Sequence, residues 1–186
     1  MAGEGSAMNR ALLELYRHKT WATLRVIEFC QGLAGDHLDA TIPGTYGTVR
    51  ETLRHLVDSE EGYLSIVTRQ PFRTKDAAAA FTRPDQMPDG PIPLDELAER
   101  IRRMGPQWET LAQDTNLPDR EVTTTDGFRL PAAVPMAQAI HHADDHRTQV
   151  LSILGARGLE VPELGVWEYD WSVAPWQELP GASPPS

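Results

Sequence analysis

Residues 140–149 of the chain are IHHADDHRTQ, which sets His142 and His146 four positions apart. In an α-helix, residues at this spacing project from one face on successive turns, so the two imidazoles are close enough to share a metal ion. A third ligand must come from another segment, and the best candidate is His55, within LRHLVD at residues 53–58. Because the two segments are far apart in the sequence, this pattern predicts a bundle in which their helices pack together.

Apolar residues recur at helical spacing in four segments of the chain. The predicted helices span residues 9–33, 49–68, 94–114 and 131–154. Thr48 is followed three positions later by Glu51, a capping-box pattern that predicts the start of the second helix. Pro131 is acceptable in the first turn of the fourth helix, and Gly155 suits its C-terminal cap.

The second helix places its apolar stripe opposite an arc of charged residues, Arg50, Arg54, Asp58 and Glu61. His55 lies at the border of this polar arc, on the side of Tyr63 and Ile66. We therefore expect His55 to face a metal site only if the helix is sandwiched between two neighbours, which the apolar residues on that side permit.

A long connection is predicted between the second and third helices. Residues 70–93 contain five prolines and should form a surface crossover, apart from a short turn at residues 77–81. A helix of about 20 residues spans roughly 30 Å, so a connection of this length can travel back along the bundle and start a parallel helix. We expect the four helices to run up-down-down-up.

Residues 122–130 are VTTTDGFRL, in which β-branched residues flank an Asp-Gly turn. This pattern predicts a short β-hairpin before the fourth helix. The predicted fold class is therefore all-α, a four-helix bundle with a long crossover between helices two and three and a short hairpin before helix four.

The composition limits the partners that the protein can have. Lys and Arg number 17 against 27 Asp and Glu, a net charge of −10, so no broad basic surface is expected for nucleic acid. Cys30 is the one cysteine, and on an apolar helix it fits a small core residue better than a nucleophile. No segment approaches the roughly 20 apolar residues that span a bilayer, and residues 1–6 lack a signal-peptide pattern. We expect a soluble, cytoplasmic protein with no membrane partner.

A chain of 186 residues fits one domain, which we place at residues 1–176. The Pro-rich residues 177–186 should form a mobile tail. The segment before this tail is aromatic, and we expect it to pack across the bundle through Trp167, Tyr169, Trp171 and Trp176.

Two charged residues fall within apolar arcs, Glu60 on the second helix and Arg147 on the fourth. Each would be costly to bury alone. We expect them to face each other, which would fix the register of the two helices and hence the distance from His55 to His142 and His146. The alternative is that either side chain extends to solvent along its aliphatic stem.

Neutral imidazole is a good ligand for zinc, nickel, iron and copper, and three such ligands from two helices leave coordination positions open. A closed structural zinc site would need a fourth strong ligand, and the chain has no Cys-x-x-Cys pair. The other histidines fit solvated positions better: His18, His37 and His141. Spacing alone does not separate a metal site from a chance arrangement in a chain with six histidines.

The segments LRHL at residues 53–56 and HADDHRTQ at residues 142–149 resemble the DinB-like (damage-inducible) family of four-helix-bundle proteins. In that family, the histidine of helix two and both histidines of a His-x-x-x-His-Arg-Gly-Gln segment hold a divalent metal. The crossover, the hairpin and the aromatic tail also fit, so the resemblance covers about residues 9–171. Thr148 stands where the family commonly has glycine, and Asp145 stands where a second histidine is frequent.

The resemblance implies that His55, His142 and His146 hold a divalent metal, for which zinc or nickel is expected. It also implies a thiol-dependent S-transferase or isomerase, in which the metal binds a low-molecular-weight thiol and stabilises its thiolate. The expected partner is then a small-molecule substrate or thiol. The family allows a homodimer, but the sequence shows no interface.

Other functions stay open from the sequence. A metal-dependent hydrolase would need a general base, for which Asp58 and Asp145 are the nearest candidates, although acids on helices usually belong to solvated faces. Asp145 also suits a residue that orients a ligand or a water. A non-catalytic bundle could instead use the metal as a structural staple while it senses a ligand or stress. A metal-free interaction bundle is the remaining class.

Overall fold

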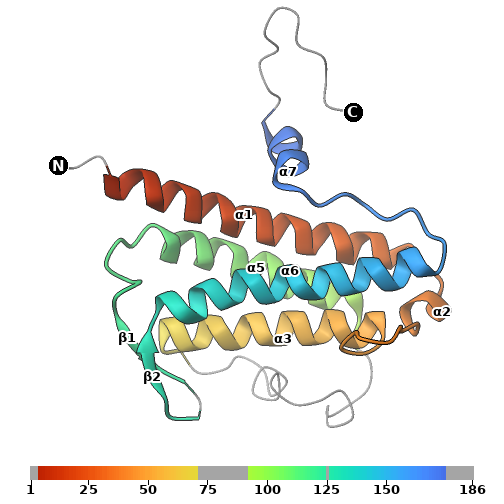
Figure 1. The fold of residues 1–186 in the computed structure, drawn as a ribbon, viewed down its shortest axis with the longest axis horizontal. Helices are drawn as coiled ribbons and strands as arrows, with labels where there is room; N and C mark the ends of the chain where they lie inside the picture. The colour runs from red at the N-terminus through yellow and green to blue at the C-terminus, as the bar shows by residue number, and fades with distance from the viewer. Residues whose placement is uncertain (1–3, 71–91, 125, 175–186) are drawn as a thin grey trace, which may run out of the picture.

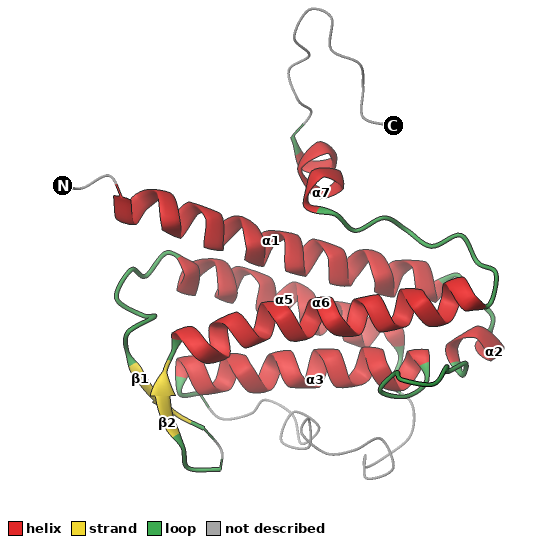
Figure 2. Ribbon diagram, in the orientation of Figure 1, coloured by secondary structure: helices red, strands yellow, loops and turns green. Residues whose placement is uncertain are grey.

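The computed structural model describes residues 4–70, 92–124 and 126–174, and four long helices dominate it (Figure 1). These helices are α1 Glu4–Gln31, α3 Val49–Thr68, α5 Leu94–Ala112 and α6 Ala133–Ala156. They pack around one cluster of buried apolar residues. A short antiparallel hairpin, β1 Glu121–Thr123 and β2 Arg129–Pro131, precedes α6 (Figure 2). The predicted bundle with a hairpin before the last long helix is confirmed.

The helices run up-down-down-up. Tyr16 of α1 contacts Met136 of α6, and Thr23, further along α1, contacts Arg147, further along α6. Because residue numbers increase in the same direction on both helices, α1 and α6 are parallel. Tyr16 also stacks on Trp108 near the end of α5, with ring centroids 4.9 Å apart, and α5 runs opposite to α1. Figure 1 shows α3 running in the direction of α5. The predicted parallel pair is therefore confirmed, while the crossover at residues 71–91 and its expected turn at 77–81 lie outside the described residues.

The start of α3 is fixed by the predicted capping box. The Thr48 hydroxyl accepts a hydrogen bond from Glu51 N at 3.2 Å, and the Glu51 carboxylate accepts one from Thr48 N at 2.8 Å. Both bonds satisfy backbone donors that the first turn of a helix leaves open.

Several predicted boundaries are wrong by a few residues. Pro131 lies in β2, paired with Glu121, so α6 begins after it and carries Pro135 in its first turn. Gly155 lies inside α6, and it is Gly158 that adopts the left-handed backbone, with φ +80°. The one-turn helix α2 Gly35–Leu38, not predicted from a stretch rich in helix breakers, is held to the core by buried Leu38.

The charged arc of α3 is buried, although its position opposite the apolar stripe suggested a solvated face. Arg54, Asp58 and Glu61 are 7%, 1% and 4% exposed. Arg100 of α5 donates to the Asp58 carboxylate at 2.6 Å and to the Glu61 carboxylate at 2.8 Å. Because these charges are compensated across the α3–α5 interface, α3 can be enclosed on this side while α6 covers another. The condition stated for His55, a second helix placed between two neighbours, is therefore met.

The predicted ion pair between Arg147 and Glu60 is not formed, and neither side chain extends to solvent. Glu60 instead pairs with Lys19 of α1, which is 0% exposed. Arg147 donates to the backbone oxygen of Lys19 at 3.2 Å and to Thr23 at 3.0 Å, and it pairs with Asp144 at 3.3 Å. The prediction failed because the apolar arcs of two helices do not reveal a lysine that a third helix inserts at their junction.

The aromatic segment packs on the bundle less extensively than expected. In α7 Val166–Val173, Tyr169 is buried and its ring lies 5.7 Å from that of Trp21 and 6.0 Å from that of His18. Trp167 is 72% exposed and Trp171 is 42% exposed. Trp176 and the predicted mobile tail lie outside the described residues.

The structure bears on two features of the composition, the one cysteine and the lack of long apolar segments. Cys30 lies in the core, where burial raises the pKa of its thiol to about 12, so it is a neutral packing residue. Within the parts of the chain that the structure describes, no helix combines the length and the apolar character needed to cross a membrane.

The buried Lys19–Glu60 pair gives a stability prediction. Lys19→Met should lower the free energy of unfolding by about 3–5 kcal/mol, because it leaves the Glu60 carboxylate buried without its cation. Adding Glu60→Leu should restore much of this loss. Urea denaturation at pH 7 measures both. The half-exposed Arg17, which pairs with Glu14 and Glu109, provides the control: Arg17→Met should cost about 1 kcal/mol or less. Equal losses in Lys19→Met and Arg17→Met would contradict the prediction.

Candidate metal centre

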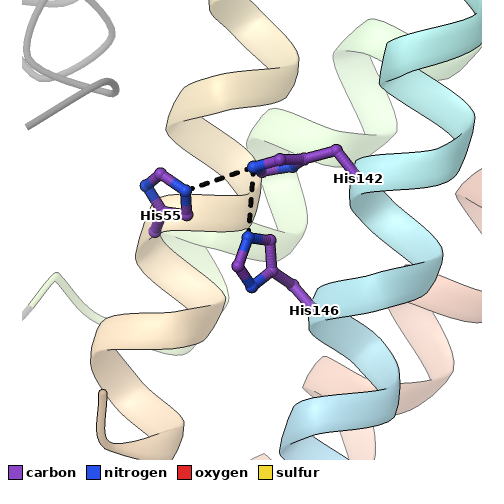
Figure 3. Close-up of side chains that lie close together, drawn as sticks. All are labelled: His55, His142 and His146. Carbon is purple, nitrogen blue, oxygen red and sulfur yellow. Dashed lines mark hydrogen bonds between the residues drawn. The ribbon is translucent and has the colours of Figure 1, made fainter. Parts of the chain in front are cut away.

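The three histidines singled out from the sequence converge between α3 and α6 (Figure 3). Nε2 of His142 lies 3.1 Å from Nε2 of His55 and 3.1 Å from Nε2 of His146. The three nitrogens all lie within 4.8 Å of one another. Two adjacent turns of α6 thus supply two imidazoles and α3 supplies the third, in the arrangement that the four-residue spacing predicts.

His55 is held in place by an aromatic neighbour from the loop before α3. The ring of Tyr46 stacks on the His55 imidazole, with centroids 3.9 Å apart and planes inclined by 14°. The same tyrosine ring meets His146 edge-on at 5.5 Å. His55 is only 8% exposed, so the Tyr46 ring replaces water over one face of the imidazole.

A single amide oxygen determines which nitrogen of His146 carries the proton. Gln149 Oε1 lies 3.2 Å from Nδ1 of His146 and accepts a hydrogen bond from Tyr46 N at 2.9 Å. Because a backbone N–H can only donate, the side-chain atom that it meets must be the oxygen, and His146 Nδ1 must therefore be a donor. In the neutral ring, Nε2 then carries the lone pair, and Nε2 is the nitrogen that faces the other two imidazoles.

The surroundings of the cluster favour neutral imidazoles. Burial, followed by the neighbouring rings of His146, His55 and His141, lowers the pKa of His142 to about 3. Burial also lowers the pKa of His146, against smaller opposing effects from Gln149 and Asp145. Deprotonated nitrogen is the form that binds a metal, so the protein presents these ligands in their binding form at neutral pH.

The donor set fits a divalent cation. Nitrogens bound to zinc at about 2.0–2.1 Å in tetrahedral geometry lie roughly 3.3 Å apart, close to the two separations of 3.1 Å. A single proton on His142 Nε2 can be aimed at only one of its two neighbours, whereas one cation attracts all three lone pairs. Three ligands on one side of an ion leave positions open on the other, where an exogenous group can bind.

The candidate acids do not join this cluster. Asp58 points to the α3–α5 interface, where it contacts Arg100 at 2.6 Å and Arg54 at 3.5 Å. Asp145 is exposed and accepts a hydrogen bond from Gln149 Nε2 at 3.4 Å. Asp145 is thus connected to His146 through the Gln149 amide.

The remaining histidines lie outside the cluster as well. His141 is exposed, and His37 lies in α2, at the far end of the loop that leads to α3. His18 is partly buried, and its Nε2 lies 2.7 Å from Leu164 O in the segment leading to α7. His18 therefore has a structural contact, where the sequence suggested solvation.

Two residues around the cluster, Tyr46 and Gln149, were missed from the sequence, while Tyr63 was expected on the side of α3 that carries His55. Tyr63 lies on α3 two turns after His55, and its ring meets His142 edge-on at 5.5 Å. Gln149 follows His146 by three positions, a helical spacing that brings the two side chains together. That spacing was a usable signal. Tyr46 lies in a loop rich in glycine, where no periodicity predicts its position.

The fold and the three imidazoles define a class of protein, an up-down-down-up helical bundle with a candidate metal centre between two of its helices. The chain belongs to the DinB family, whose family model matches residues 8–178. Among solved structures it is similar to a DinB-like protein from Bacillus cereus ATCC 10987, with a TM-score of 0.60 and 18% identity over 83% of this chain and 95% of the other. At this identity, the likeness shows the fold. Among curated proteins, no match is found.

Gln149 gives a prediction about ligand orientation. Gln149→Leu should weaken zinc binding about 10- to 100-fold, because it removes the acceptor that holds the His146 tautomer. Gln149→Glu keeps an acceptor at the same position and should bind zinc at least as tightly as the wild type. Competition titration with a chromophoric chelator measures both, and Gln113→Leu, at an exposed position directly after α5, is a remote control. Unchanged affinity in Gln149→Leu would contradict the proposed orientation.

The lowered pKa of His142 predicts how the metal-free protein responds to acid. Because the pKa is about 3 in the folded protein and about 6.5 in the unfolded chain, the unfolded chain binds more protons between these values. Stability should therefore fall as the pH is lowered from 6.5 towards 3. Between pH 6 and pH 4, His142→Asn should lose about 2 kcal/mol less than the wild type. Urea titrations of chelator-treated protein test this, and parallel curves for the two proteins would refute it.

Proposed function

We propose that this protein is a metal-dependent enzyme of small-molecule thiols, an S-transferase or isomerase in which His55, His142 and His146 hold zinc or nickel. The observation that carries the proposal is the convergence of three imidazole nitrogens, all within 4.8 Å of one another. A divalent ion held there supplies Lewis-acid stabilisation of a thiolate near neutral pH. Membership of the DinB family supports the metal site, and the thiol chemistry is inferred from the resemblance to that family.

The chain's own residues orient the ligands and exclude water from them. Gln149 accepts from His146 Nδ1, so the Nε2 lone pair is directed at the centre of the cluster. Tyr46 covers His55, and Tyr63 covers one edge of His142. These contacts fix the ligands before the metal arrives, which lowers the cost of assembling the site.

The positions of the acids favour thiol chemistry over hydrolysis. Asp58 forms ion pairs with Arg54 and Arg100. Asp145 is exposed and hydrogen-bonded to Gln149. A hydrolase would need a side chain to take a proton from water, and neither acid is placed beside the imidazole nitrogens as such a base. A thiol needs less help, because its proton is lost near neutral pH once the sulfur binds a cation.

Metal analysis of matched variants tests the site. Wild-type protein reconstituted with zinc should hold about one equivalent, and His55→Ala and His146→Ala should each bind more than about 100-fold more weakly, because each loses a direct ligand. His141→Ala, an exposed neighbour on the same helix, should behave like the wild type. Full retention of metal by either ligand variant would remove that histidine from the site.

Cobalt substitution tests the chemistry at the open positions. Addition of a small thiol to cobalt-loaded protein should produce a sulfur-to-cobalt charge-transfer band and should raise the melting temperature. The same thiol should have no effect on chelator-treated protein. If metal stabilises the fold while no thiol changes the spectrum or the melting temperature, the metal has a structural role. The proposal of a thiol-dependent enzyme is then ruled out.

A further inference from the structure

A cavity of about 490 Å³ lies beside the candidate metal centre. It is open to solvent on one side and bounded by α3, by the hairpin and by the first turns of α6, and its apolar lining comes from Ile66, Leu130, Val134 and Pro135. This volume falls within the range of roughly 300–1,000 Å³ that small-molecule pockets occupy.

Tyr63 links this cavity to the imidazoles. Its side chain lines the cavity, its ring meets that of His142 at 5.5 Å, and it is hydrogen-bonded to Gln138. Gln138 also lines the cavity and lies one helical turn before His142 on α6. Tyr63 therefore adjoins both the cavity and His142, and Gln138 lies beside it.

The charges of the lining select against anions. Among the described residues that line the cavity, Asp126 of the hairpin carries the one formal charge. A ligand carboxylate or sulfonate placed here would meet a like charge and apolar walls, and would lose its hydration without a cationic partner. A neutral aryl or branched alkyl group would instead exchange water for apolar contact, while the Tyr63–Gln138 pair remains able to meet one polar atom.

We infer that this cavity is the subsite for the apolar part of the substrate, an uncharged aryl or branched alkyl group whose reacting end lies at the three imidazoles. The inference rests on the proposed function, since it takes the metal centre as the place of reaction. It adds the substrate class, a small molecule with an uncharged apolar tail, and it makes Val134 and Tyr63 determinants of specificity.

The exposure of Val134 provides a variant that fills the cavity without disturbing the core. Val134 is 53% exposed on the first turn of α6, so Val134→Trp should place an indole over the cavity at little cost in stability. Ala137, also exposed and three residues later, lines a separate cavity of about 670 Å³ on the side of α6 that faces α1. Ala137→Trp is therefore the matched control.

Cobalt-loaded protein titrated with two thiol series tests the inference. One series is phenylalkanethiols with one to four methylenes, and the other is mercaptocarboxylates of the same lengths. The charge-transfer band should give a dissociation constant at least about ten-fold lower for the best phenylalkanethiol than for its matched carboxylate. Val134→Trp should reduce this ratio to about three-fold or less, while Ala137→Trp should keep it.

The outcomes separate the subsite from the metal chemistry. If both series give the band with equal affinities, or if Val134→Trp keeps the wild-type ratio, the subsite is refuted while the proposed function stands. A metal-independent measurement covers the opposite case: benzyl alcohol should shift the methyl NMR signals of Leu130 and Val134 in chelator-treated protein. Such shifts without a band from any thiol would overturn the thiol chemistry and retain the apolar pocket. Absence of the shifts would overturn the pocket.

Discussion

The buried ion pair between Lys19 and Glu60 is the constraint on which the arrangement of three helices depends. Lys19 comes from α1 and Glu60 from α3, and the backbone oxygen of Lys19 accepts a hydrogen bond from Arg147 of α6. Removing two charges from water costs several kcal/mol per ion, so such a pair adds little net stability over an apolar contact. Its effect is to favour one register of the helices, because a shift of either helix along its axis would leave a charge buried without its partner. The Lys19 ammonium also lies 5.7 Å and 5.3 Å from the ring centroids of Tyr16 and Trp108, which extends the constraint to α5.

The same network reaches the candidate metal centre through sequence neighbours. Arg147 follows His146 directly, and Glu60 lies five residues after His55 on α3. A rotation of α6 that released Arg147 from Thr23 and Lys19 would therefore also turn His146 away from His55. The ion pair sets α3 against α1, and Arg147 sets α6 against α1, so the convergence of the imidazoles follows from the placement of both helices on α1. Glu60 and Arg147 both belong to this network, but Lys19, not Arg147, is the ion-pair partner of Glu60.

The features that the sequence predicted well are those that depend on local spacing. The i, i+4 pair of His142 and His146, the Thr48–Glu51 capping box and the Asp-Gly hairpin each involve residues within a few positions of one another, so helix or turn geometry alone decides their arrangement. Features that need two or three elements were missed or misassigned. Arg54, Asp58 and Glu61 have the pattern of a solvated face, and the burial of the two acids depends on Arg100, which lies 42 and 39 residues away in the sequence. His55 lies between these cases, since its helix and its place beside His142 and His146 were predicted, but its position at the border of the polar arc left its direction dependent on how the helices pack.

The loop before α3 shows how a site can depend on a residue without any sequence pattern. Tyr46 lies among glycines and threonines. Its backbone N–H donates to Gln149, and its ring contacts His55 and His146. The Gln149 side-chain oxygen accepts hydrogen bonds from Tyr46 N and from His146 Nδ1. The candidate ligand His146 and the residue that covers His55 therefore share one acceptor. If the Tyr46 loop were displaced, Gln149 would lose one of the two hydrogen bonds that hold its side chain in place. Gln149 would then hold His146 less firmly, and the His55 ring would lose its cover. The metal centre is therefore a property of α3, α6 and this loop together, and grafting the three histidines onto another pair of helices would not reproduce it.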